Sequence, residues 1–166
     1  MAYIATKINI KTSRINHSVI IPHQILEGTL LGADVTHPGG TSNEGTPSTV
    51  AVVGSLDARC GGFHSSMCLQ DRANLEVTLS PKLVNTSHAY HAHQLIANFQ
   101  PMVEERILAH YQTQKTWLKR VHYYRDSVSE GQYSQVRRAE VAKIRTAFEH
   151  VVPKNQRKRL LALLRL

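Results

Sequence analysis

Two aspartates, Asp34 and Asp126, are the residues best placed by type and position to do metal chemistry. Each falls at the end of a short run that reads as a β-strand, at residues 29–35 and 120–124. If these strands are neighbours ending at the same sheet edge, the two carboxylates meet there. Paired carboxylates are what a Mg²⁺ site on a phosphodiester needs. The alternative is that each aspartate merely caps or turns the chain, as most aspartates after strands do.

The elements that must hold these aspartates are read from hydrophobic periodicity. Alternating or Val-rich runs predict strands at residues 4–10, 29–35, 48–56, 63–69 and 120–124. Gly61 and Gly62 predict a turn that joins the third and fourth of these strands into a hairpin. Pro38 stops the second strand because proline cannot donate to a strand ladder.

Two helices are predicted from apolar residues at helical spacing. The first carries its stripe over residues 95–107, and Pro101 marks either its start or a kink. The second follows residues 129–132, whose Ser and Gln fit a capping box, and Pro153 ends it. Residues 70–90 read as a polar loop or insertion. This order of strands, helix, strand and helix predicts an α/β fold with an antiparallel start.

The composition suits one basic domain that attracts polyanions. The 166 residues include 20 Lys and Arg against 12 Asp and Glu, a formal net charge of +8. Phosphate backbones are the commonest polyanions, although the charge could equally serve solubility. Cys60 and Cys68 form no CxxC pair, which argues against a disulfide framework or a zinc ribbon. Because no apolar run approaches the ~20 residues of a membrane span, we expect a soluble, intracellular chain.

Four short segments resemble signatures of the Argonaute Piwi domain. They are KINIK at residues 7–11, GADVTHP at 32–38, PSTVAVVGSLD at 47–57 and YRDSVSEGQ at 124–132. They stand in the family's order, and the resemblance covers residues 4–150. It implies an RNase H-like mixed sheet flanked by helices and incomplete at the C-terminus. The implied parts are the end of the MID–Piwi junction (1–28), a partial Piwi domain (29–153) and an atypical basic, leucine-rich tail (154–166).

The resemblance also implies a function in RNA-mediated gene silencing. Its partners would be a small guide RNA, a target RNA and silencing-complex proteins, with no membrane, in the cytoplasm or the nucleus. The family activity is Mg²⁺-dependent endonucleolytic cleavage of the guide-paired RNA, and Asp34 and Asp126 would bind the two metal ions. Lys7 and Lys11 would contact the guide's 5′ phosphate, since residues four apart share one side of a strand. The alternative is two solvated lysines.

The family's third carboxylate is a glutamate, for which this chain offers two registers. Counting forward from Leu69, Glu76 falls one residue past the expected position. Counting back from Val103, the expected position is Gln94. The helical register is harder to shift because its apolar stripe must stay on the core, which favours Gln94 slightly. An amide there cannot supply the negative charge that a metal requires.

The chain departs from the family pattern at three further points. The fourth catalytic position would lie beyond the last residue, and basic residues 154–159 replace the strand expected after Pro153. Ser127 replaces a Gly, which is tolerated if its φ stays negative. We therefore expect a fragment, a truncated gene model or a shortened paralogue that does not cut RNA alone. An RNA-guided endonuclease, a non-cleaving RNA-binding fragment and a non-functional remnant remain the competing hypotheses.

Several histidines invite a second metal hypothesis. His88, His91 and His93 could supply three imidazoles, but no acidic or Cys partner lies close by. We favour a solvated insertion for this segment. His37 belongs to the GADVTHP segment, and we expect a structural role for it rather than general-base catalysis.

Overall fold

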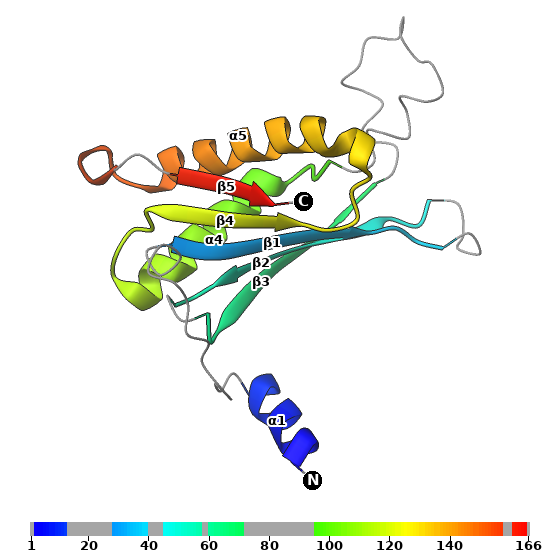
Figure 1. The fold of residues 1–166 in the computed structure, drawn as a ribbon, viewed down its shortest axis with the longest axis horizontal. Helices are drawn as coiled ribbons and strands as arrows, with labels where there is room; N and C mark the ends of the chain where they lie inside the picture. Colours follow the sequence, from blue (N-terminus) through cyan, green and yellow to red (C-terminus); the bar gives the residue numbers. More distant parts are fainter. Residues whose placement is uncertain are drawn as a thin grey trace, which may run out of the picture.

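The computed structural model describes residues 2–12, 28–39, 45–57, 60–71, 95–157 and 161–165. Its centre is a five-stranded sheet of order β3-β2-β1-β4-β5 (Figure 1). The strands are β1 (Gly28–Thr36), β2 (Ser48–Ser55), β3 (Phe63–Gln70), β4 (Arg120–Arg125) and β5 (Leu161–Arg165). Strands β1, β2 and β3 pair antiparallel, whereas β4 pairs parallel with β1 and with β5. The predicted α/β fold with a mixed sheet that starts antiparallel is confirmed.

Helices α4 (Phe99–Gln114) and α5 (Tyr133–Val151) cover one face of this sheet. Alternate strand residues point into the core on that side, and Phe99 packs on Tyr123 with ring centroids 5.4 Å apart. The buried apolar residues from the sheet are Leu31, Ala33, Val35, Val50, Val52, Val121 and Tyr123. The opposite face exposes Val53, Met67, Leu69 and Tyr124. The site residues described below lie on this open face.

The predicted hairpin and helices agree with the structure in all but one detail. Helix α4 begins at Phe99, so Pro101 lies in the first turn, where its missing N–H costs nothing. A short 3₁₀ turn, η2 (Glu130–Gln132), precedes α5. The capping-box prediction is wrong, because Ser129 makes no side-chain cap to the backbone. Its hydroxyl bonds the Gln132 side-chain oxygen at 2.8 Å instead.

The predicted strand over residues 4–10 is also wrong, because these residues belong to helix α1 (Ala2–Lys11). Ile4 and Ile8 are four apart, a spacing that fits a helix as well as a strand. A strand needs a neighbour for its backbone groups, whereas a helix satisfies them internally. None of the five described strands pairs with this segment, and α1 stands clear of the sheet in Figure 1. Its Tyr3, Ile4 and Ile8 side chains are exposed.

A strand does follow Pro153, contrary to the sequence-based expectation. After the 3₁₀ turn η3 (Lys154–Gln156), β5 runs parallel to β4 with Arg120 opposite Leu161 and Tyr124 opposite Arg165. The prediction missed this strand because the basic segment dominates the region and the leucine-rich run that follows it is short. Pairing along the edge of β4 satisfies backbone groups of that run. The last residues therefore extend the same sheet that carries Asp126's strand.

Candidate metal centre at the ends of β1 and β4

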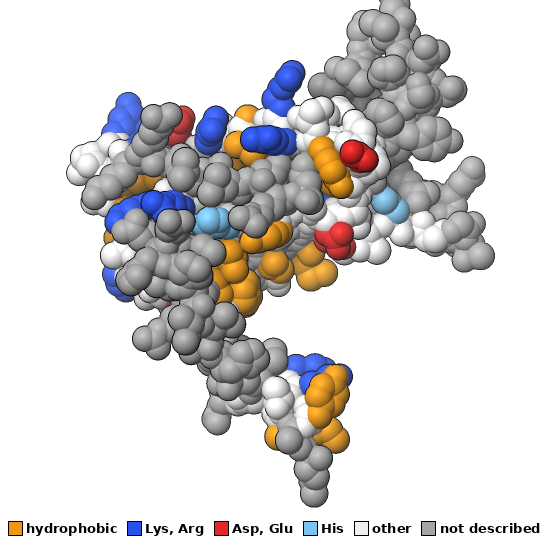
Figure 2. All heavy atoms as spheres, in the orientation of Figure 1, with side chains coloured by type: hydrophobic (Ala, Val, Ile, Leu, Met, Phe, Trp, Pro, Cys, Tyr) orange, Lys and Arg blue, Asp and Glu red, His pale blue; other side chains and the backbone are white. Residues whose placement is uncertain are grey.

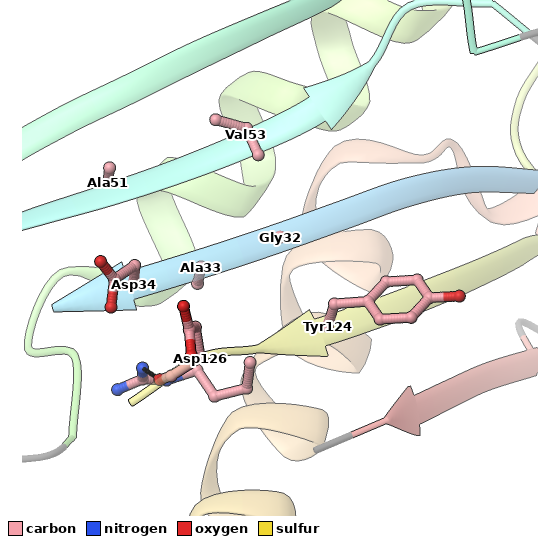
Figure 3. A pocket seen from close by; sticks show the side chains of 8 residues that line it. Gly32, Ala33, Asp34, Ala51, Val53, Tyr124 and Asp126 are labelled. Atoms are coloured by element: carbon pink, nitrogen blue, oxygen red, sulfur yellow. Dashed lines mark hydrogen bonds between the residues drawn. The ribbon is translucent and has the colours of Figure 1, made fainter. Parts of the chain in front are cut away.

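The parallel pairing of β1 and β4 brings Asp34 and Asp126 together. Ala33 lies opposite Arg125, and the Asp126 N–H donates to the Ala33 carbonyl at 3.1 Å. Asp34 directly follows Ala33, and Asp126 directly follows Arg125, so both aspartates come immediately after the same pair of opposed residues. Figure 3 shows the two side chains side by side at the ends of these strands. The prediction that the two aspartates lie on adjacent strands is confirmed.

Both carboxylates border a pocket of about 600 Å³ on the open face of the sheet. Its lining consists mainly of small or apolar residues, with the acidic pair at one end (Figure 3). The lining residues are Gly32, Ala33, Asp34, Ala51, Val53, Tyr124, Arg125 and Asp126. Figure 2 shows hydrophobic side chains gathered over the sheet and acidic ones at the end toward which β1 and β4 run. The two carboxylates therefore lie at the border of a surface pocket.

Asp34 is half-buried and is oriented by its own sequence neighbours. The Val35 N–H donates to Oδ1 at 2.8 Å, and the Thr36 hydroxyl donates to Oδ2 at 3.4 Å. A carboxylate has about four lone-pair sites, so these two bonds leave acceptor capacity on both oxygens. Such oxygens are the ligands that hard divalent cations prefer.

Asp126 is exposed, and it is held by its two sequence neighbours as well as by Ala33. Its Oδ1 accepts the Ser127 N–H at 2.7 Å, while its carbonyl accepts a hydrogen bond from Arg125 Nη1. Ser127 itself has φ of 61°, in the left-handed region that favours glycine. The condition under which a serine would replace the family's glycine without strain, a negative φ, is not met.

Behind Asp126 lies a buried polar cluster of Tyr123, Arg125 and Glu140. The Tyr123 hydroxyl donates to Glu140 Oε2 at 2.6 Å, and Arg125 Nε donates to Glu140 Oε1 at 3.3 Å. The Arg125 and Glu140 side chains are 0% and 1% exposed. Burial raises the pKa of Glu140, against the opposing effects of Tyr123 and Arg125. Burial and the neighbouring Glu140 raise the pKa of Tyr123 well above its ordinary value.

Sequence reasoning missed Glu140. It sits on the buried stripe of α5, four residues after Val136 and four before Ile144. A charged residue on an otherwise apolar stripe is the signal that could have found it, because buried charges require partners.

The two predicted phosphate-binding lysines lie on α1, away from the aspartates (Figure 1). Lys7 and Lys11 are exposed and one helical turn apart, so they still share one face although the element is a helix. Lys7 Nζ lies 4.6 Å from the centre of the Tyr3 ring. The structure does not bring these lysines to the candidate metal centre.

The two candidates for the third carboxylate position and the histidines weighed as a second metal site fall outside the described residues. This applies to Glu76, to Gln94 and to His88, His91 and His93. Among the residues that the structure describes, no group of three or more His, Cys, Asp or Glu side chains could hold a metal ion. His37 bonds the buried Ser48 hydroxyl through Nδ1 at 2.8 Å, which fits the structural role expected for it.

Comparison with known proteins places this geometry in a family. Residues 1–165 match the Piwi domain family. Solved structures with similar folds include the MID–PIWI domains of an N. crassa AGO protein, with 22% identity and a TM-score of 0.69 over 98% of this chain. Kluyveromyces polysporus Argonaute with a guide RNA gives 23% and 0.71 over 98%. The C-terminal lobe of a budding yeast Argonaute gives 23% and 0.70 over 97%.

This chain spans 42%, 18% and 30% of the chains in those three structures, respectively. At these identities the similarity establishes a shared fold. Within the described residues, no helix is long and apolar enough to cross a membrane. The match to the family over nearly every residue, together with the paired aspartates on β1 and β4, shows that the chain belongs to the Piwi domain family.

Proposed function

We propose that this chain binds a small guide RNA paired with a target RNA, and that Asp34 and Asp126 hold Mg²⁺ beside a target phosphodiester. The observation that carries the proposal is the placement of these two carboxylates at the ends of adjacent parallel strands in a Piwi family member. The family's reaction would then be endonucleolytic cleavage in RNA-mediated silencing. A similar fold is known from an Argonaute that holds a guide RNA.

The donor atoms at this edge fit Mg²⁺. The ion prefers one or two carboxylates together with substrate phosphate and water. Asp34 and Asp126 supply two carboxylates with acceptor capacity left beside a pocket of about 600 Å³. When bound, Mg²⁺ would offset the negative charge of the phosphate and polarise its oxygens. The protein's own part is to orient the two carboxylates and to leave the open sheet face free for a duplex.

The basic charge of the chain supports a polyanionic ligand. The net charge of +8 favours association with phosphate backbones, and exposed Lys7 and Lys11 offer two ammonium groups on one helical face. We propose that this pair contacts the guide's 5′ phosphate. The proposal rests on the family signature and on the shared helix face.

Divalent-metal binding by the full chain tests the proposed centre. Mn²⁺ is a spectroscopic substitute for Mg²⁺, and paramagnetic resonance reports its free concentration. We expect the wild type to bind Mn²⁺, and Asp34→Asn and Asp126→Asn each to weaken binding at least tenfold. Glu149→Gln, which removes an exposed charge on α5, is the matched control and should bind as the wild type does. Wild-type affinity in both aspartate variants would refute the centre.

Activity is tested separately with a 5′-phosphorylated guide and a labelled complementary target in Mg²⁺. Cleavage that depends on the guide and is lost in Asp126→Asn would establish an endonuclease. Binding of the duplex without cleavage would assign the non-cleaving role instead. Failure to bind the paired RNA at low salt would contradict the RNA-binding proposal itself.

A further inference from the structure

The two edges of the Arg125 guanidinium contact different parts of the molecule. Its Nε donates to Glu140 Oε1 on α5 at 3.3 Å, and its Nη1 donates to the carbonyl of Asp126. The other Glu140 oxygen accepts the Tyr123 hydroxyl at 2.6 Å. Both oxygens of this carboxylate are therefore engaged, and its orientation is fixed from two strand residues. A continuous set of bonds runs from the middle of α5 to the backbone of Asp126.

Stability alone does not explain this cluster. Two charges with side-chain exposures of 0% and 1% have lost their hydration, and such pairs often contribute no more than apolar residues would. The neighbouring positions on the α5 stripe, Val136 and Ile144, are apolar and fully packed. A buried ion pair placed directly behind a functional residue is better explained by the orientation that it imposes.

The bonds at Asp126 show what is being oriented. Its N–H donates to the Ala33 carbonyl at 3.1 Å, and its own carbonyl accepts from Arg125. Beyond it, Ser127 turns the chain out of the strand with a φ of 61°. Asp126 is thus the last residue tied to the sheet before the backbone changes direction. A fixed carbonyl at this point also fixes the direction in which the side chain leaves the backbone.

We propose that Glu140 is a positioning residue: through Arg125 it holds the backbone of Asp126 so that this carboxylate faces Asp34 across the candidate metal centre. The inference deepens the proposed function and rests on it. The guanidinium is suited to the task because its planar fork presents donors on two edges. A lysine ammonium in the same place could keep the pairing with Glu140 but would lack the rigid second arm toward Asp126.

The first experiment reads the position of Asp126 without any metal. Amide hydrogen exchange by NMR on the full chain reports the Asp126 N–H, which bonds Ala33. In Arg125→Lys and in Glu140→Gln we expect exchange at Asp126 to accelerate about tenfold relative to the other amides of β1 and β4. Tyr123→Phe removes only the hydroxyl bond to Glu140 and should produce a smaller change in the same direction. Arg145→Lys, at an exposed α5 position, is the matched control and should leave the exchange unchanged.

The second experiment measures Mn²⁺ affinity in the same variants. Residues that orient a ligand typically cost 10–100-fold in affinity when removed, so we expect at least a tenfold loss in Arg125→Lys and Glu140→Gln. The double variant Arg125→Met with Glu140→Gln removes both buried charges together and should recover much of any lost folding stability. Under the proposal its metal affinity stays low. If affinity returned together with stability, Glu140 would be a purely structural residue and the inference would be overturned.

The two readouts separate this inference from the proposed function. Unchanged exchange at Asp126 in the folded variants overturns the positioning role, whatever Mn²⁺ does. If exchange at Asp126 accelerates in the variants but the wild type binds no Mn²⁺, the proposed metal centre is refuted and the orienting network is retained. Should the single variants fail to fold, Tyr123→Phe and the double variant, which leave no unpaired buried charge, give the same readings.

Discussion

The ends of β1 and β4 carry the same residue type at the same sheet edge, but they are held in different ways. Asp34 is oriented by the N–H of Val35 and the hydroxyl of Thr36, its immediate neighbours. The Asp126 carboxylate also accepts the N–H of its neighbour Ser127, but its backbone carbonyl is in addition held by Arg125, and through it by Glu140, fourteen residues further along in α5. Local bonds of the first kind form whenever the strand forms. The second arrangement requires a packed core, so we expect mutations to affect the two ends unequally.

The largest difference between the two strand ends is expected when the side-chain support of Asp126, at the end of β4, is removed and the β1 end is left intact. Glu140→Ala leaves the buried Arg125 charge without its carboxylate partner, which typically costs about 3–5 kcal/mol. Thr36→Ala at the β1 end removes one long, exposed hydrogen bond and should cost less than about 0.5 kcal/mol. Urea unfolding of both variants measures the difference. A loss below about 1 kcal/mol in Glu140→Ala would show that β4 needs no support from α5.

The pH dependence of folding stability tests the environment of Glu140, the residue that supports Asp126 through Arg125. Because burial raises the folded-state pKa of Glu140, the folded chain binds its proton more tightly than the unfolded chain does. This contribution to stability is fully present below the ordinary pKa of 4.5 and is lost as the pH rises through the raised folded value. The free energy of unfolding of the wild type, relative to Glu140→Gln, should therefore fall as the pH increases above 4.5. Denaturant titrations at several pH values check it, and a difference that grows with pH would contradict the direction of the shift.

The residues after the two aspartates differ as well. Val35 continues β1 with its side chain in the core, whereas Ser127 is left-handed with a φ of 61°. A non-glycine residue pays roughly 1–2 kcal/mol for that conformation, so Ser127→Gly should stabilise the chain by about 1 kcal/mol. Ser129→Gly provides the contrast: Ser129 has a φ of −73° and its hydroxyl bonds Gln132, so glycine there should not stabilise the chain. Equal melting temperatures for Ser127→Gly and the wild type would show that the serine is unstrained.

This contrast also explains what the sequence could predict. The strands around Asp34, the hairpin after β2 and the stripe of α5 follow from periodicity and turn residues, which are local properties. Their pairing could be anticipated because two strands each ended at an aspartate. The Arg125–Glu140 bond joins residues whose contact depends on how α5 packs on β4, and no local pattern encodes that packing. Two of the errors concern short segments: the spacing in α1 fits a helix as well as a strand, and the basic residues before β5 gave no strand signal, so in both the presence or absence of a pairing strand decides the structure.

The smallest expected effect concerns α1, where charge acts without any tertiary support. Lys7 and Lys11 are exposed on one helical face, so their loss should leave folding stability unchanged within about 0.5 kcal/mol. If both contact guide phosphates, each lost contact should flatten the plot of log affinity against log salt by about 0.7 units for a single strand. Lys7→Ala with Lys11→Ala should therefore flatten it by about 1.4 units and reduce any preference for 5′-phosphorylated over 5′-hydroxyl RNA. The control is Arg145→Ala with Lys154→Ala, which removes the same charge from exposed positions on α5 and η3 and should keep the 5′-phosphate preference. If both double variants changed the slope and the 5′-phosphate preference equally, α1 would contribute only to the general positive charge. The contrast between locally and remotely supported residues would then apply to the two aspartates alone.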